Sequence, residues 1–209
     1  MSGKDGSEGA VAARDAASLI VLERRGEAAS VLMGMRAAGH RFMPSRLVFP
    51  GGAVERGDFS APAARGLAPA TQAMLEKGAE PPLARALAMA AARELAEETG
   101  LSLGSPPSLD GLFYLCRAIT PPAAPIRFHA RFLIVAGERL AGALGGSGEL
   151  EGLRFYRLGD ELGRSSGLGL PWITARVLEE LAAWLALPEA ERCGERPSAL
   201  FRNRGREEE

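Results

Sequence analysis

Short apolar runs, each about the length of a β-strand, recur along the chain between residues 14 and 190. They are bounded by charged residues, glycine or proline, which is typical of strands joined by turns. The runs that predict strands are Ala17–Leu22, Ser30–Arg36, Leu47–Phe49, Leu112–Ile119, Arg127–Ala136 and Leu153–Leu158. The third of these runs is stopped by Pro50-Gly51-Gly52.

Leu83–Thr99 has the composition of a helix. It consists mostly of Ala, Leu, Arg, Met and Glu, which are strong helix formers. Pro81-Pro82 precedes it and Gly100 follows it, as expected for a helix with proline in its first turn and glycine after its last. A second helix is predicted after Pro171, where the apolar residues at helical spacing are Ile173, Val177, Leu181 and Trp184.

Strands before, between and after two helices predict an α/β (α+β) domain in which helices sandwich a mixed sheet. A length of 209 residues suits one domain with its own core. We expect this domain over residues 14–190. The segments 1–13 and 191–209 offer little that could be buried, and we predict that both are flexible tails.

The overall composition narrows the function classes. The chain is 46% hydrophobic, and 25 Lys and Arg residues against 26 Asp and Glu leave a net charge of -1, which does not favour nucleic-acid binding. No apolar run approaches the roughly 20 residues that span a bilayer, and the first residues do not resemble a secretory signal. Cys116 and Cys193 are expected to be free thiols. We therefore expect a cytoplasmic protein that binds neither membrane nor nucleic acid.

Three glutamates in the last turns of the first predicted helix are the strongest candidates for chemistry. Glu94, Glu97 and Glu98 are spaced i, i+3 and i+4, so their carboxylates project from one face. They repel one another, and the negative end of the helix dipole disfavours each by about 0.3 to 1 kcal/mol. A divalent cation reverses both effects, because Mg²⁺ and Mn²⁺ prefer hard oxygen ligands. The alternative is a solvated acidic face, partly compensated by Arg93.

The segment Arg93–Leu101 resembles the second half of the Nudix box, RE-U-x-EE-x-G-U with U apolar, and it matches every specified position. The first half of the box is similar to Gly52–Asp58, with Asp at the final acidic position. The box normally has seven residues between its halves, whereas residues 59–92 intervene here. We interpret them as an insertion within the Nudix box that leaves both halves free to meet and that reshapes the substrate cleft or acts as a lid.

This resemblance implies a Nudix-type α-β-α sandwich with a mixed β-sheet and a metal-dependent hydrolase. It implies that Mg²⁺ or Mn²⁺ is bound by Glu94, Glu97 and Glu98 together with the backbone carbonyl of Gly52. The general base is expected to be Glu98 or Glu94, although a later loop glutamate serves in some relatives. Arg93 would orient the carboxylates. Candidates for an extra base or ligand are Glu149 and Glu151, for which a plain polar loop is the alternative.

The segment that precedes the box points to a branch of the family. Arg36–Gly52 resembles the coenzyme A diphosphatase signature, from which it departs at Ser45. Together with the interrupted box and with Arg127–Phe132, it is similar to the peroxisomal coenzyme A diphosphatase-like branch and its bacterial relatives. The resemblance implies cleavage of coenzyme A or acyl-CoA to 3′,5′-ADP and (acyl-)phosphopantetheine. Candidate substrate-binding residues are Arg36, Arg41, Arg46, Gly51 and Gly52, the arginines as phosphate contacts or else as ordinary surface residues.

Two other functions stay open. One is a pyrophosphatase for ADP-ribose, nucleotide sugars or oxidised dNTPs, which would share the same box. The other is a Nudix domain that senses a nucleotide without hydrolysing it. The complete set Glu94, Glu97 and Glu98 favours an enzyme, because a pure sensor has no need of it. The family often dimerises, so a homodimer is compatible with the resemblance.

Overall fold

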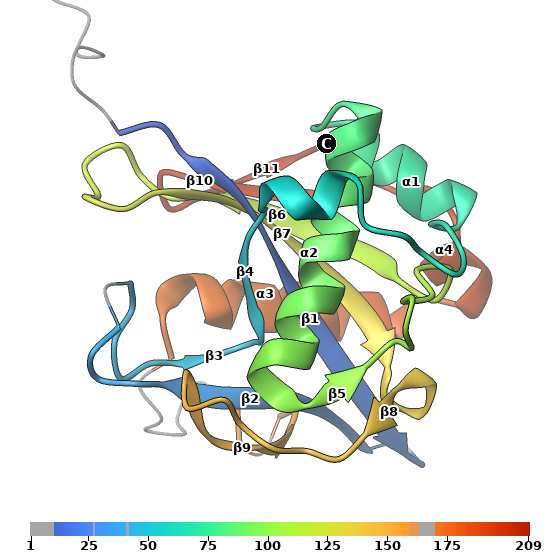
Figure 1. The fold of residues 1–209 in the computed structure, drawn as a ribbon. Helices are drawn as coiled ribbons and strands as arrows, with labels where there is room; N and C mark the ends of the chain where they lie inside the picture. The colour runs from blue at the N-terminus through green and yellow to red at the C-terminus, as the bar shows by residue number, and fades with distance from the viewer. Residues whose placement is uncertain (1–10, 27, 41, 160, 163–169) are drawn as a thin grey trace, which may run out of the picture.

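The computed structural model describes residues 11–26, 28–40, 42–159, 161–162 and 170–209. The expected tail over residues 1–10 and the candidate Arg41 lie outside the described residues. Figure 1 shows that one twisted sheet lies between two helical layers. The predicted α/β architecture with a mixed sheet is therefore confirmed.

The sheet has nine strands, ordered β11-β10-β6-β7-β1-β2-β3, with β4 also paired to β1 and β9 to β2. It is mixed, because β1–β7 and β6–β10 pair in parallel while the other pairs are antiparallel. Its strands are β1 (Arg14–Arg25), β2 (Ala28–Arg36), β3 (Leu47–Val48), β4 (Gly51–Ala53), β6 (Phe113–Ile119), β7 (Phe128–Ala136), β9 (Leu150–Arg157), β10 (Ala199–Arg202) and β11 (Gly205–Glu208). A separate pair consists of β5 (Leu101–Ser102) and β8 (Ala141–Gly142).

The central strand β1 is buried on both faces. Leu19 and Val21 point into one hydrophobic core, and Ile20 and Leu22 point into the other, because successive side chains of a strand alternate. A near-continuous apolar run is typical of a strand that is covered on both sides. This burial explains why the sequence pattern identified the strand.

The helices cover the two faces of the sheet. α1 (Pro69–Glu76) and α2 (Pro81–Thr99) pack on one face, and α3 (Trp172–Ala186) packs on the other (Figure 1). The remaining helical turns are η1 (Arg56–Phe59), η2 (Gly137–Arg139) and α4 (Glu189–Cys193). In the part of the chain that the structure describes, no helix combines the length and hydrophobicity needed to cross a membrane.

The helix α2 has the ends that its sequence predicts. Proline occupies its first turn, and Gly100 caps it in the left-handed conformation with φ of 74°. The amide of Gly100 donates to the carbonyl of Ala96 at 3.0 Å. Most of the buried positions of α2 are alanines, whose small side chains let the helix lie close to the sheet. The last turn is thereby fixed beside β4.

The C-terminal segment corrects one expectation. Residues 191–209 were expected to be a flexible tail, but α4, β10 and β11 form there, and β10 extends the main sheet. Ala199 is the register partner of Cys116 in β6, and Phe201 is 2% exposed. The prediction was wrong because only three consecutive residues, Ala199-Leu200-Phe201, carry the buried surface. Cys116 and Cys193 are free cysteines, as expected.

Residues 59–92, the insertion predicted from the sequence, make contacts with the residues on both sides of them. They contain the end of η1, all of α1 and the first half of α2. The Thr71 hydroxyl donates to the carbonyl of Leu112 at 2.7 Å, and Arg85 donates to the carbonyls of Asp58, Phe59 and Ala61. The Thr71 contact thus holds α1 beside the segment that precedes β6. The Arg85 contacts hold residues 58–61 against α2, so that Asp58 faces this helix.

Candidate active site

A buried carboxylate at the end of α2 forms the centre of the site. Glu98 is 2% exposed, and its Oε2 atom accepts a hydrogen bond from the amide of Gly51 at 2.8 Å. Burial raises the pKa of Glu98 to about 7, against the opposing effects of the Gly51 hydrogen bond and of Arg36. The neighbouring charges of Glu94 and Glu149 raise this pKa further. Near neutral pH, Glu98 can therefore both hold and release a proton.

Glu94 lies one helical turn before Glu98 and against the backbone of β4. The Glu94 carboxylate occupies the place where a Cβ atom on Gly52 would lie, so Glu94 would have to move for any residue with a side chain at position 52. Burial raises the pKa of Glu94, while Arg93 opposes this shift. The two glycines Gly51 and Gly52 thus present backbone to the carboxylates of Glu94 and Glu98.

Arg93 joins the end of α2 to the segment Gly52–Asp58. Its guanidinium donates to Glu94 at 2.9 Å, to Glu97 at 3.0 Å, and to the carbonyl of Ala53 at 3.1 Å. It also donates to both carboxylate oxygens of Asp58, at 3.0 and 3.2 Å. Asp58 is 3% exposed, so this is a largely buried ion pair. The structure therefore brings the two segments together despite the residues between them.

The three glutamates are not equivalent. Glu97 is the most exposed, with 57% of its side chain accessible, and it is bonded to Arg93. Within the residues that the structure describes, no three His, Cys, Asp or Glu side chains converge closely enough to hold a metal ion. Glu94 and Glu98 nevertheless supply hard carboxylate oxygens beside Gly51 and Gly52, and the Glu94 carboxylate occupies the place of a Gly52 side chain. This donor set suits a divalent cation in its chemistry.

Of the two loop glutamates, the structure brings Glu149 toward the site. Glu149 is exposed ahead of β9, and its charge raises the pKa of both Glu94 and Glu98. Its backbone carbonyl accepts a hydrogen bond from Ala37 at 3.0 Å. Glu151 is exposed on β9, opposite Met35.

The candidate arginines lie in different places. Arg36 ends β2, lowers the pKa of Glu98 by its charge and lines a cavity with Gly51 and Gly52. One of its terminal nitrogens lies 3.2 Å from Nε2 of His40, and its Nε atom is buried without a hydrogen-bond partner among the described residues. Arg46 is exposed before β3. Arg36 is therefore the candidate that the fold directs toward the site.

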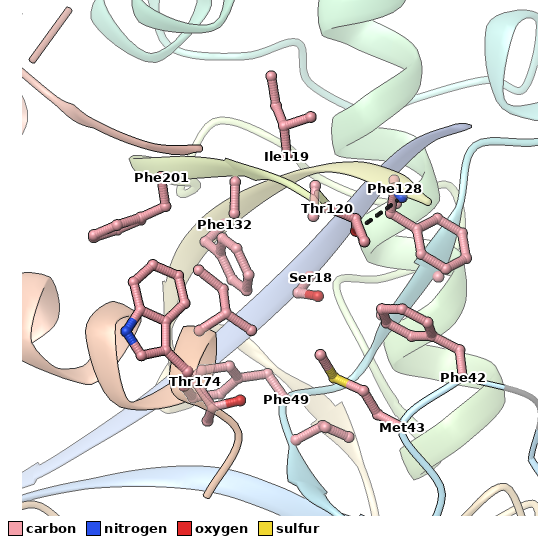
Figure 2. A pocket seen from close by; sticks show the side chains of 18 of the residues that line it. Ser18, Phe42, Met43, Phe49, Ile119, Thr120, Phe128, Phe132, Thr174 and Phe201 are labelled. Carbon is pink, nitrogen blue, oxygen red and sulfur yellow. Dashed lines mark hydrogen bonds between the residues drawn. The ribbon is translucent and has the colours of Figure 1, made fainter. Parts of the chain in front are cut away.

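The cavity beside Gly51 and Gly52 has a volume of about 300 Å³ and lies between the sheet and the start of α3. Its wall is mostly apolar and includes Phe42, Phe128, Phe132 and Phe201 (Figure 2). Residues 59–92, all of which the structure describes, do not line it. This cavity was not predictable from the sequence, because its residues come from strands and loops that meet only in the fold.

Comparison with known proteins connects this arrangement to a class of enzymes. No protein-family model matches the chain, and no curated protein matches it. The structure of a Nudix hydrolase from Alicyclobacillus acidocaldarius is similar, with 28% sequence identity and a TM-score of 0.64, and the match covers 83% of this chain and 92% of that one.

Two further structures share the fold. A MutT Nudix hydrolase from Burkholderia pseudomallei is 18% identical, with a TM-score of 0.52 over 82% of this chain and 99% of its own. The Nudix domain of NrtR from Shewanella oneidensis, in complex with ADP-ribose, is 14% identical, with a TM-score of 0.54 over 88% of this chain and 95% of its own.

The protein is a hydrolase. Its fold and its similarity to the Alicyclobacillus enzyme support a place in the Nudix superfamily, as the resemblance of Arg93–Leu101 predicts. The Nudix hydrolase fold in turn supports a pyrophosphohydrolase that acts on nucleotide derivatives and that uses a divalent metal ion.

Proposed function

We propose that the protein hydrolyses the diphosphate linkage of coenzyme A or an acyl-CoA and releases 3′,5′-ADP and (acyl-)phosphopantetheine. The observation that carries the proposal is the partly buried Glu94 and the buried Glu98, which lie against the backbone of Gly51-Gly52. The substrate class comes from the resemblance of Arg36–Gly52 to the coenzyme A diphosphatase signature.

Mg²⁺ or Mn²⁺ would be held by Glu94, Glu97 and Glu98, with the carbonyl of Gly52 as a further ligand. When bound, the cation neutralises charge on the diphosphate and lowers the pKa of the attacking water. In this proposal Glu97 gives up its bond to Arg93 in order to join the other two carboxylates. Arg93 stays anchored by Asp58 and keeps Glu94 in position.

The chemical step is the attack of water on one phosphorus and the breaking of its bond to the bridging oxygen, which leaves with the other phosphate. A carboxylate takes the proton of the water. Glu98 suits this role because its pKa of about 7 is close to the working pH of a general base. Glu94 is the second candidate within the box, and Glu149 is the candidate from the loop. Arg36 is proposed to neutralise a phosphate next to Gly51.

A panel of substrates tests the proposal. The protein is incubated with Mg²⁺ or Mn²⁺ and CoA, acetyl-CoA, ADP-ribose, NADH, diadenosine polyphosphates or dNTPs, and the products are identified by mass spectrometry. We expect 3′,5′-ADP from CoA and a higher kcat/KM for CoA than for ADP-ribose. ADP-ribose belongs in the panel because the related NrtR domain was crystallised with it. A preference for ADP-ribose would contradict the substrate assignment.

The same panel separates the enzyme from the sensing alternative. Binding of a nucleotide without cleavage of any panel member would contradict hydrolysis and favour a sensor. Glu195→Gln is a suitable control variant, because Glu195 is exposed beyond α4. It should match the wild-type rate, whereas Glu98→Gln should be slower by at least about 100-fold.

A further inference from the structure

Alanines form the floor of the cavity beside Gly51-Gly52. Ala16 of β1, Ala130 of β7 and Ala118 of β6 are register partners in three adjacent strands, and all three line the cavity. Phe128 and Phe132 lie two positions from Ala130 on the same face of β7 and form side walls. Figure 2 shows these two rings on either side of Ser18. The row of small side chains therefore leaves a channel under the start of α3.

The channel runs across the strands. Gly51 and Gly52 of β4 line one end, and Phe201 of β10 and the following Arg204 line the other. β4, β1, β7, β6 and β10 are successive neighbours in the sheet. Four interstrand steps of roughly 4.8 Å give a span of about 19 Å. At about 3.5 Å for every three bonds of an extended chain, this span accommodates a chain of roughly 16 bonds.

The channel suits an uncharged and largely apolar chain. Its polar side-chain groups, counted over the described residues, are the hydroxyls of Ser18, Thr120 and Thr174, the indole N–H of Trp172 and the guanidinium groups of Arg36 and Arg204. The Thr120 hydroxyl already accepts the amide of Phe128 at 3.0 Å.

The aromatic rings are arranged for edge contact. Phe42 and Phe128 meet at 74° and Trp172 and Phe201 at 90°, so neither pair offers two parallel faces between which a base could stack. The rings instead offer hydrophobic surface along the length of the channel. This arrangement favours an extended chain over a nucleobase.

Gly51 links the channel to the buried carboxylate of Glu98. The amide of Gly51 donates to Glu98 although Gly51 itself lines the channel. Arg36 lines it as well, and its buried Nε atom has no hydrogen-bond partner in the described part of the chain. A diphosphate bound at Gly51-Gly52 would therefore place its ester group at the end of the channel that these two glycines line.

We infer that this channel binds the pantetheine arm of the substrate, with the arm extended from the phosphate at Gly51-Gly52 toward Phe201 and Arg204. The inference rests on the proposed function and specifies which part of coenzyme A is recognised apart from its nucleotide. From phosphorus to sulfur the arm has about 13 bonds, or about 15 Å when extended, so it fits within the span of about 19 Å and its thiol or thioester lies toward the end of the channel at Phe201.

The experiment fills the channel and measures binding without turnover. Ala130→Leu places a larger side chain on the channel floor, and Ala183→Leu makes the same change at an exposed position of α3 as a matched control. Titration calorimetry with Mg²⁺ gives the Kd of each variant for 4′-phosphopantetheine and for 3′,5′-ADP. Circular dichroism checks that the variants are folded, and Ala118→Leu replaces Ala130→Leu if that variant is not.

We expect Ala130→Leu to weaken the binding of 4′-phosphopantetheine by about tenfold, the effect of losing contact with roughly two methylene groups. Its Kd for 3′,5′-ADP should stay within about twofold of wild type, and Ala183→Leu should change neither value. A larger loss for 3′,5′-ADP would mean that the channel holds the nucleotide, and unchanged binding of 4′-phosphopantetheine would overturn the inference too. Cleavage of CoA with either result leaves the proposed function intact, whereas cleavage of ADP-ribose alone contradicts that function.

Discussion

Replacing Glu98 by glutamine should make the metal-free protein more stable and less active. The glutamine amide oxygen can still accept the hydrogen bond from Gly51, but no charge remains to be buried. The pKa of Glu98 is raised from 4.5 to about 7, mainly by burial, so the folded protein holds this proton more strongly than the unfolded chain. The stability that results is fully present below about pH 4.5 and is lost as the pH rises through about 7.

The magnitude follows from the same interval. At roughly 1.36 kcal/mol for each tenfold change, the ionised Glu98 lowers the stability of the folded state at pH 8 by about 3 kcal/mol. Glu98→Gln should recover this amount, a rise in Tm of roughly 6 to 12 °C for a domain of this size.

Thermal unfolding at pH 5 and pH 8, with EDTA to remove cations, measures the effect. The gain should be present at pH 8 and small at pH 5. Glu97→Gln is the matched control, because 57% of the Glu97 side chain is exposed, and it should change stability by less than about 0.5 kcal/mol. An unchanged or lowered Tm for Glu98→Gln at pH 8 would show that burial of the ionised Glu98 carboxylate does not destabilise the folded protein.

Three further variants test other contacts. Asp58→Asn weakens the buried pair with Arg93 and should lower the free energy of unfolding by about 3 kcal/mol in urea titrations; a loss below about 1 kcal/mol would contradict the role of this pair. Gly52→Ala puts a methyl group against Glu94 and should reduce turnover by at least about tenfold in a protein that remains folded by circular dichroism. Deletion of residues 199–209 removes the buried Leu200 and Phe201 and should cost at least about 3 kcal/mol, and the buried Cys116 should then react faster with Ellman's reagent.

Local sequence signals predicted the elements that depend on neighbouring residues. The end of α2 is one example, because composition and the cap at Gly100 act within a few residues. The contact between Asp58 and Arg93 is different in kind. The spacing of Asp58 and Arg93 does not predict this contact, because residues 59–92 separate them. Only the resemblance to an interrupted Nudix box suggested that the two segments lie together.

Features that depend on distant strands were not predictable from the sequence. β10 lies beside β6, which is about 80 residues earlier in the chain, and its three apolar residues are too few to stand out from their charged surroundings. The row Ala16, Ala118 and Ala130 exists only because β1, β7 and β6 align in this register. An alanine alone in a strand gives no sign that it will form the floor of a channel.

We propose that the carboxylates of Glu94 and Glu98, beside Gly51-Gly52, are required for hydrolysis of a diphosphate. The most direct test is the rate of CoA cleavage in Mn²⁺ and in EDTA, measured by chromatography of 3′,5′-ADP, for wild type, Glu98→Gln and the control Glu195→Gln. We expect cleavage by wild type and by Glu195→Gln in Mn²⁺ alone, and a rate at least about 100-fold lower for Glu98→Gln. Cleavage by Glu98→Gln at the wild-type rate would contradict it.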